Sequence, residues 1–172
     1  MFDKLIEFLI SIIELLRFFW VVRQWERAIN LRFGHWTGKV MQPGFHFILP
    51  FAMDEVHTID IIPSVAELDP QTIVTKDKVV VVAQALIKYQ VDKPEICLIE
   101  VANEIDAVKE FTQGAIHTVV SETDYATANV KDIEKKVKEQ AQKEVDKWGI
   151  KIKSVVLKSF GKMSSLRLLN SK

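Results

Sequence analysis

The sequence predicts an α+β fold, in which a membrane-embedded helix precedes one compact domain. Three observations support this prediction. Residues 1–25 are strongly apolar, residues 26–92 contain short segments of alternating apolar and polar residues, and residues 93–160 contain apolar residues at helical spacing before a last alternating segment. The first pattern is typical of a helix in a bilayer, the second of strands and the third of amphipathic helices. Residues 161–172 are predicted to form a short tail.

The N-terminal segment, residues 1–25, has a wider apolar face than a soluble helix needs. A charge at the centre of a bilayer costs about 2.5 to 3.5 kcal/mol, so Glu7, Glu14 and Arg17 oppose a simple span. Three interpretations remain open: a helix lying in one leaflet, a spanning helix in which Glu14 pairs with Arg17, and a soluble helix inside an oligomer core. The expected bilayer contacts here are Phe2, Leu5, Leu9, Ile12, Ile13, Leu16, Phe19, Trp20 and Trp25.

Two arginines, Arg23 and Arg27, follow the apolar segment. Basic residues beside a spanning helix favour the cytoplasmic side of a membrane. We therefore expect a membrane-associated protein whose folded domain lies on the cytoplasmic face.

Residues 26–92 are predicted to form the β-rich half of the domain. Glycine and proline separate its segments, at Gly34, at Gly38 and in a tight turn over residues 41–45. The clearest strand covers residues 78–91, because its odd-numbered positions are almost all apolar and several even-numbered ones are polar. The other predicted strands cover residues 28–33, 45–49, 56–65 and 71–75.

Residues 93–160 are predicted to form the helical half and the closing strand. Pro94 begins a short helix, and Asn103 and Asn129 are expected to cap two longer helices. Gly149 ends the second of these. A last strand follows over residues 150–160. The predicted apolar stripes are Ile105, Val108, Phe111, Ala115 and Val119 on one helix and Ile133, Val137, Ala141, Val145 and Trp148 on the other.

The composition argues against nucleic-acid binding and against catalysis. The chain has 23 Lys and Arg residues against 23 Asp and Glu residues, without the basic excess of a nucleic-acid binder. Cys97 lies in an apolar segment typical of a packed core. No P-loop, GxSxG or paired-cysteine motif occurs, and the histidines His35, His46, His57 and His117 lack metal-site spacing. We expect no catalytic residue, no metal and no cofactor.

Four segments occur in a recognisable order: ERAINLRFG (26–34), PGFHFILP (43–50), TKD (75–77) and WGIK (148–151). Together they resemble the stomatin, prohibitin and flotillin superfamily, which has the SPFH or band-7 domain, and stomatin-type members most. The resemblance covers residues 26–160. The chain departs from it in two respects: no proline precedes Pro43 to make a membrane hairpin, and no long helix rich in alanine and glutamate follows the last strand.

The resemblance implies a non-enzymatic scaffold that self-assembles into a ring-like homo-oligomer and organises a membrane microdomain. It also implies that the first half of the domain lies against the bilayer, with contacts at Phe45, Phe47, Leu49 and Phe51. The alternative for these residues is a strand packed in the core. Expected contacts between copies are Glu7, Glu14, Arg17, Lys135, Glu139 and Lys153. The alternative function is a minimal adaptor for a longer SPFH protein, a membrane protease or a channel.

Overall fold

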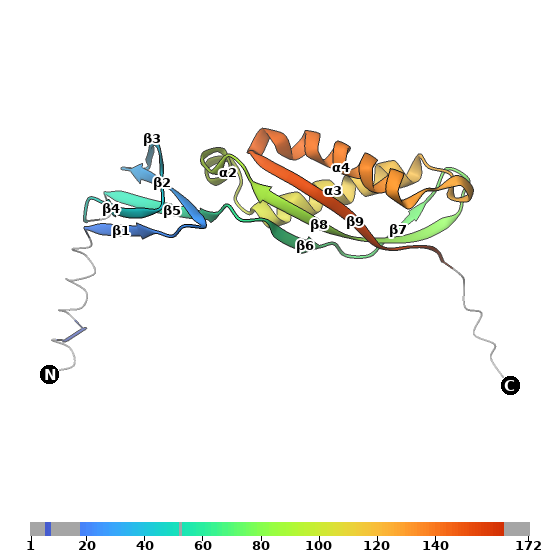
Figure 1. Cartoon of the computed structure of the whole chain (residues 1–172), viewed down its shortest axis with the longest axis horizontal. Coiled ribbons are helices and arrows are strands. Elements are labelled where there is room, and N and C mark those ends of the chain that lie inside the picture. Colours follow the sequence, from blue (N-terminus) through green and yellow to red (C-terminus); the bar gives the residue numbers. More distant parts are fainter. Residues whose placement is uncertain (1–5, 8–17, 52, 164–172) are drawn as a thin grey trace. The chain divides into compact units, whose positions relative to one another are not determined.

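The described residues form two compact units in a computed structural model (Figure 1). The structure describes residues 6–7, 18–51 and 53–163 of the 172-residue chain. Unit 1 is Met1–Ile62 with Val91–Ala102, and unit 2 is Pro63–Gln90 with Asn103–Lys172. The strand over residues 80–91 therefore belongs, up to Gln90, with the long helices, and the short helix Pro94–Glu100 belongs with the first strands.

Over residues 18–51, 53–62 and 91–102, unit 1 consists of two small antiparallel sheets and one helix. Its elements are β1 (Phe19–Val22), β2 (Glu26–Arg32), β3 (His35–Met41), β4 (Gly44–Phe47), β5 (Asp54–Asp60) and α2 (Pro94–Glu100). β1 pairs with β4 in a two-stranded ribbon, and β2 lies between β3 and β5 in a second sheet. α2 packs against β2 and β5. The buried side chains include Ile29 and Cys97, so the cysteine is in the core as predicted.

Unit 2 is a two-layer sandwich, with two helices on one face of a four-stranded sheet (Figure 1). Its elements are β6 (Ser64–Glu67), β7 (Gln71–Val74), β8 (Val80–Val91), α3 (Glu104–Ser121), η1 (Tyr125–Thr127), α4 (Val130–Val145), η2 (Asp146–Trp148) and β9 (Ile150–Lys162). β6 and β7 pair with successive parts of β8, and β9 also pairs with β8. α3 contacts β6 and β7, α4 contacts β9, and the two helices contact each other.

The alternation in β8 determines which face of this sheet the helices cover. Val81, Ala83, Ala85, Ile87 and Tyr89 are all buried, and the residues between them are only partly covered or exposed. The α4 stripe Ile133, Val137, Ala141 and Val145 is also buried. Both patterns confirm the sequence prediction, whereas Ile105, expected in the α3 stripe, is 42% exposed.

The ends of the helices in unit 2 are fixed by the residues that the sequence predicts. The Asn103 side chain accepts hydrogen bonds from the backbone N–H groups of Ile105 and Asp106, at 3.1 and 3.3 Å. Asn129 accepts one from the N–H of Lys131 at 3.1 Å. Gly149 has a φ of 70°, a left-handed conformation that glycine adopts without steric cost, and it ends this helical region.

Side chains of α4 secure β9 through its backbone. The Gln142 side chain accepts a hydrogen bond from the N–H of Ile152 at 2.7 Å and donates one to the carbonyl of Ile150 at 3.0 Å. Glu134 accepts one from the N–H of Leu157 at 2.8 Å. These bonds satisfy backbone groups that an edge strand would otherwise expose.

A turn between β7 and β8 is tied to the connection between α3 and α4. The Thr75 hydroxyl donates a hydrogen bond to the Asp77 carboxylate, and the backbone N–H of Tyr125 donates another at 3.1 Å. These two hydrogen bonds, the Thr75 one foremost, lower the pKa of Asp77 from its ordinary value. The TKD segment therefore joins the turn between β7 and β8 to the connection between α3 and α4.

The structure corrects one prediction for the N-terminal part of the chain and adds one strand that was not predicted. The helix expected over residues 1–25 does not extend to its end, because Phe19–Val22 forms β1. Aromatic and β-branched residues suit a strand, and β4 supplies a partner for one. β3 was not predicted, because its residues are mostly exposed and show no buried alternation. The rest of the expected helix lies in residues 1–17, of which only 6–7 are described.

Candidate membrane-contact surface

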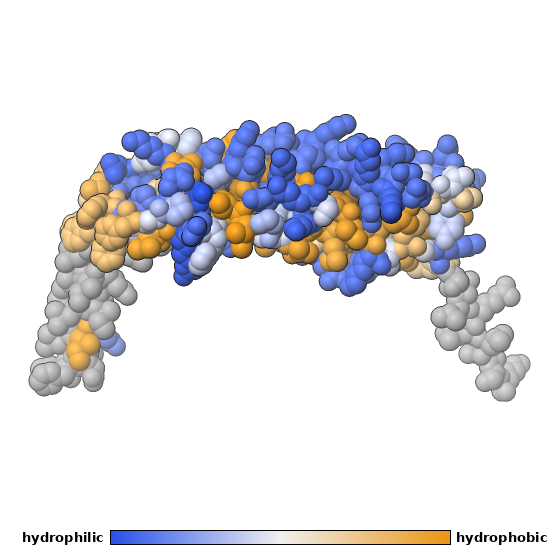
Figure 2. All heavy atoms as spheres, in the orientation of Figure 1, coloured by the Kyte–Doolittle hydropathy of each residue, from blue (hydrophilic) through white to orange (hydrophobic). Residues whose placement is uncertain are grey.

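One face of the β1–β4 ribbon is made of exposed apolar side chains. The register pairs Phe19 with Phe47 and Val21 with Phe45, and residues that are directly opposite in antiparallel strands share a face. These four side chains are 53%, 82%, 59% and 56% exposed, respectively. The rings of Phe19 and Phe45 stack at 5.3 Å, and Phe47 meets Phe45 edge-on at 5.3 Å. Figure 2 shows hydrophobic side chains gathered over β1 and β4.

Hydrogen bonds bring further apolar residues to the end of unit 1 at which β1 begins and β4 ends. The N–H of Ile48 donates to the carbonyl of Phe18 at 2.9 Å, and the N–H of Phe33 donates to the carbonyl of Met53 at 2.8 Å. The turn between β2 and β3 therefore lies beside the loop between β4 and β5. The exposed residues at this end are Phe18, Phe33, Trp36, Leu49 and Phe51.

We refer to the exposed ribbon face and this end together as the apolar surface. Its residues are Phe18, Phe19, Val21, Phe33, Trp36, Phe45, Phe47, Leu49 and Phe51. Phe33 and Phe51 have φ angles of 50° and 62°, which are uncommon for bulky residues. The two turns thus hold aromatic side chains in solvent although smaller residues would fit them with less strain.

A buried carboxylate lies beneath this end of the unit. Asp54, whose side chain is 0% exposed, accepts hydrogen bonds from two Arg32 nitrogens at 2.8 and 3.2 Å. It also accepts one from the N–H of Leu49 at 2.9 Å. The Arg32 hydrogen bond, with smaller contributions from Leu49 and Asn30, outweighs burial and lowers the pKa of Asp54 to about 2. The charged pair therefore joins β2, β5 and the loop that carries Leu49 and Phe51.

The structure separates the predicted membrane contacts into three groups. Phe19, Phe45, Phe47, Leu49 and Phe51 lie together on the apolar surface. Trp20 is on the opposite face of the ribbon, and Trp25 is in the turn at the far end of β1, with Arg23 5.8 Å from its ring. The predicted contacts at Phe2, Leu5, Leu9, Ile12, Ile13 and Leu16 lie outside the described residues.

Four members of the apolar surface, Phe18, Val21, Phe33 and Trp36, were not predicted from the sequence. Phe18 and Val21 were part of the expected helix. Phe33 precedes a glycine that marks a turn, which was the only local signal. Its exposure depends on the left-handed turn geometry and on the pairing of β2 with β5, neither of which the sequence displays.

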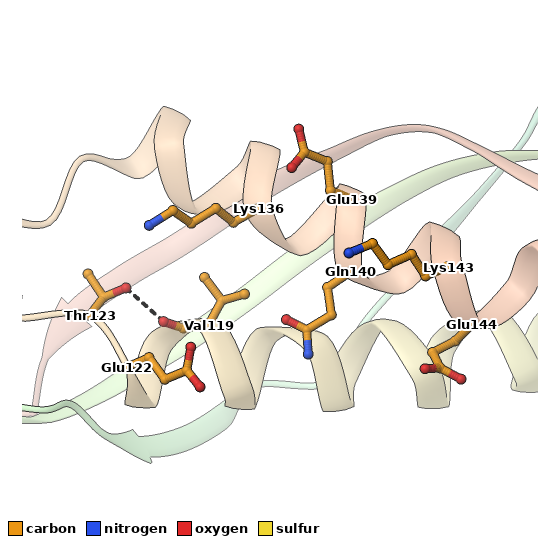
Figure 3. A pocket seen from close by; sticks show the side chains of 8 residues that line it. All are labelled: Val119, Glu122, Thr123, Lys136, Glu139, Gln140, Lys143 and Glu144. Carbon is orange, nitrogen blue, oxygen red and sulfur yellow. Dashed lines mark hydrogen bonds between the residues drawn. The ribbon is translucent and has the colours of Figure 1, made fainter.

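A groove of about 570 Å³ lies between α3 and α4 in unit 2 (Figure 3). Its lining residues are Val119, Glu122, Thr123, Lys136, Glu139, Gln140, Lys143 and Glu144. Acidic and basic side chains alternate along it, and Thr123 is occupied by a hydrogen bond to the carbonyl of Val119 at 2.7 Å. The groove contains no histidine or cysteine. It therefore offers a polar, mixed-charge surface without a recognisable nucleophile and base.

The histidines are dispersed, on β3, β4, β5 and α3. Among residues 6–7, 18–51 and 53–163, no three His, Cys, Asp or Glu side chains are grouped so that they could hold a metal ion. In the same part of the chain, no helix combines the length and the apolar character that a membrane span requires. The apolar surface is thus the main candidate for a functional contact in the described residues.

Comparison with known proteins gives a family match over most of the chain. Residues 20–161 match the family model of the SPFH domain / Band 7 family. The chain is 30% identical to the uncharacterized protein MJ0827 of Methanocaldococcus jannaschii over 140 residues, 80% of this chain and 69% of the relative. It is 26% identical to stomatin homolog PH1511 of Pyrococcus horikoshii, covering 80% and 52% of the two chains. Human podocin is 27% identical, covering 80% and 37%.

The chain thus spans about two thirds of MJ0827 but only about half of the Pyrococcus relative. The matched part includes both units, because residues 20–161 begin in β1 and end in β9. The region that matches the family model is therefore the folded part of the chain, from β1 to β9.

Proposed function

Since this chain belongs to the SPFH domain / Band 7 family, we propose that it is a non-enzymatic membrane scaffold whose copies associate with one another on a bilayer. The observation that carries the membrane part of the proposal is the apolar surface of unit 1. Family membership is consistent with such a role, and the resemblance in the sequence points to stomatin-type scaffolds.

The size of the apolar surface supports insertion into lipid. Large exposed apolar side chains are ordinary when they are scattered, but contiguous groups mark contact surfaces. Full burial of a large apolar side chain is worth about 1.5 to 3 kcal/mol. Transfer of these nine residues from water into lipid would therefore be favourable even if each were only partly buried. Phe47 alone is 82% exposed, so most of its surface is available for burial. Aromatic side chains also favour the interfacial layer of a bilayer.

The domain would lie on the cytoplasmic face, because Arg23 and Arg27 follow the apolar N-terminal segment. Other copies of the chain are the second proposed partner, through Lys135 and Glu139 of α4 and Lys153 of β9, all of which are exposed. Glu7 is exposed too, whereas Glu14 and Arg17, proposed with it, lie outside the described residues. A ring of such copies would organise a membrane microdomain.

Membrane contact can be tested with a fluorescent reporter on the full chain. The reporter is an NBD label on Phe47→Cys, with Lys135→Cys as the matched position in unit 2; Cys97 is 1% exposed and should not react. On liposomes, NBD at position 47 should brighten and be quenched by doxyl lipids, because that position enters the apolar phase. NBD at position 135 should do neither. Equal, weak signals from both positions would overturn the membrane contact.

Self-association is tested separately, by mass photometry of the detergent-extracted chain. The scaffold proposal expects particles at multiples of the 19.7 kDa chain mass. A monomer at every concentration would overturn it. Oligomers that form only when a longer family member is expressed with the chain would favour the adaptor function instead.

A further inference from the structure

The segments that form the apolar surface contain no acidic residue, lysine or arginine. They are residues 18–22, 33–36 and 45–51, and His35 and His46 are their only ionisable side chains. Such a surface can take apolar groups out of water, but it has no charge of its own with which to select a ligand. The residues at its border therefore decide whether charged lipid is attracted.

Every arginine in the described part of unit 1 has an acceptor within the protein. Arg23, just after β1, lies 3.4 Å from the Glu26 carboxylate. Arg27 donates to the carbonyl of Glu26 at 2.7 Å. Arg32, at the end of β2, binds the buried Asp54 through two nitrogens. A lipid phosphate would thus have to displace a carboxylate to bind Arg23 or Arg32, the two arginines that border the apolar surface.

The charge balance of unit 1 gives no basic excess either. Over residues 1–62 and 91–102 the sequence contains seven basic and ten acidic residues. Lys39 of β3 is exposed, and the exposed acidic residues Glu55 and Asp60 of β5 offset it. Attraction to anionic lipid usually requires a cluster of basic residues near the membrane, and unit 1 does not supply one.

The aromatic rings of the apolar surface form a continuous face. Phe45 contacts both Phe19 and Phe47, with 5.3 Å between the ring centroids in each pair. A continuous apolar face displaces a patch of headgroups, whereas a scattered side chain can enter between them. Its burial is therefore easiest where the headgroups are already spread apart and the acyl chains are accessible.

We propose that the apolar surface binds the accessible acyl chains of loosely packed bilayers, irrespective of headgroup charge. This inference rests on the proposed membrane contact and names the kind of bilayer that the contact prefers. Binding through this surface should be insensitive to salt and to phosphatidylserine, because its free energy comes from apolar burial. It should increase on strongly curved vesicles, whose headgroups are spread apart.

The test uses the full chain with NBD at position 47 and records the lipid concentration at half-maximal brightening. Small sonicated vesicles and large extruded vesicles are compared at low and high salt. Each is made of dioleoylphosphatidylcholine, with or without dioleoylphosphatidylserine. The chain also carries Lys151→Gln and Lys153→Gln, because these exposed lysines of β9 would add an attraction to anionic lipid from unit 2.

In this chain, phosphatidylserine and salt should each change the half-maximal concentration by less than about twofold, since no described arginine of unit 1 is available to a lipid phosphate. Small vesicles should require several-fold less lipid than large ones, because the apolar face enters them more easily.

Glu26→Gln, added to the same chain, should create the charge dependence that unit 1 lacks. It releases Arg23, whose side chain is 66% exposed, and the new amide oxygen can still accept from the backbone N–H of Arg23. Binding to phosphatidylserine vesicles should tighten about fivefold and become sensitive to salt, while binding to phosphatidylcholine should not change. Glu100→Gln, at an exposed position of α2, removes the same charge and should show no such gain. Circular dichroism checks that each variant is folded.

Three outcomes would overturn the inference while leaving the membrane contact in place. They are a phosphatidylserine or salt effect above about twofold before Glu26→Gln is added, equal binding to small and large vesicles, and an unchanged lipid preference in Glu26→Gln. Absence of brightening at position 47 on every vesicle would instead overturn the membrane contact, and the inference would fail with it.

Discussion

Unit 1 leaves most of its aromatic side chains in solvent, whereas unit 2 buries a set of large aliphatic side chains. In unit 2 the largest fully buried side chains include Ile73, Ile87, Ile116 and Ile133. In unit 1 the core is small, and Phe33, Phe47 and other aromatic residues remain exposed. The two units are therefore stabilised in different ways. Unit 2 depends on burial within itself, and unit 1 depends more on strand pairing and on the pair between Arg32 and Asp54.

The largest effect on stability is expected in the core of unit 2. Ile116→Ala removes a side chain that is only 2% exposed, where α3 packs against the sheet. The free energy of unfolding should fall by about 3 kcal/mol, because the transfer free energy is lost and a cavity remains. Urea denaturation followed by circular dichroism measures it. A loss below about 1 kcal/mol would contradict the tight core attributed to unit 2.

Asp54→Asn tests the corresponding support in unit 1. The substitution removes the charge that binds two Arg32 nitrogens and the N–H of Leu49, and should cost roughly 2 kcal/mol of unfolding free energy. The pKa of Asp54 is about 2 in the folded chain, against an ordinary value of 3.8, so the carboxylate stabilises the fold above that range.

The difference in unfolding free energy between wild type and Asp54→Asn should therefore be constant above about pH 5 and shrink as pH falls from there toward 2. Denaturation at a series of pH values measures the difference. A gap that is independent of pH down to 2 would show that the carboxylate charge is not what stabilises the unit.

Gln142→Ala tests how unit 2 secures its edge strand. The bonds to Ile152 and Ile150 are lost, and the cost should be about 1 kcal/mol. Amide hydrogen exchange at Ile152 should accelerate because its N–H then faces water. Gln140→Ala, on the same helix but lining the groove, is the matched control. Unchanged exchange at Ile152 would mean that the side chain does not hold the strand.

Phe47→Ser should have the smallest effect on folding. Its side chain is 82% exposed, so unfolding free energy should change by less than about 0.5 kcal/mol. Liposome binding, in contrast, should fall under the proposed function. A strongly destabilised Phe47→Ser chain would mean that the apolar surface supports the fold of unit 1, and the contrast between the units would then be smaller.

Much of unit 2 could be predicted from the sequence, because its signals are local. The alternation in β8, the caps Asn103 and Asn129 and the stop at Gly149 all arise within a few residues of the feature that they specify. Packing then buries the predicted faces and reinforces the same assignment. Local preference and tertiary structure agree there.

Unit 1 was harder to predict, because its features depend on pairing between distant segments. β1 has the composition of the apolar run before it, and only β4 gives it a strand partner. Phe33 and Phe51 meet at one end because β2 pairs with β5 from Arg32 and Asp54 onward. Membrane contacts were predicted at Phe45, Phe47, Leu49 and Phe51. Their exposure together with Phe33 and Trp36 was not predicted.

The hydrogen bond from the N–H of Leu49 to the buried Asp54 carboxylate affects how a ligand would bind at the apolar surface. The backbone at Leu49 is held by this buried carboxylate, so Leu49 is already in place before the protein meets a ligand. A ligand that contacts Leu49, lipid or protein, therefore loses little binding free energy to ordering the backbone there. Association at this loop would be governed by encounter and not by coupled folding.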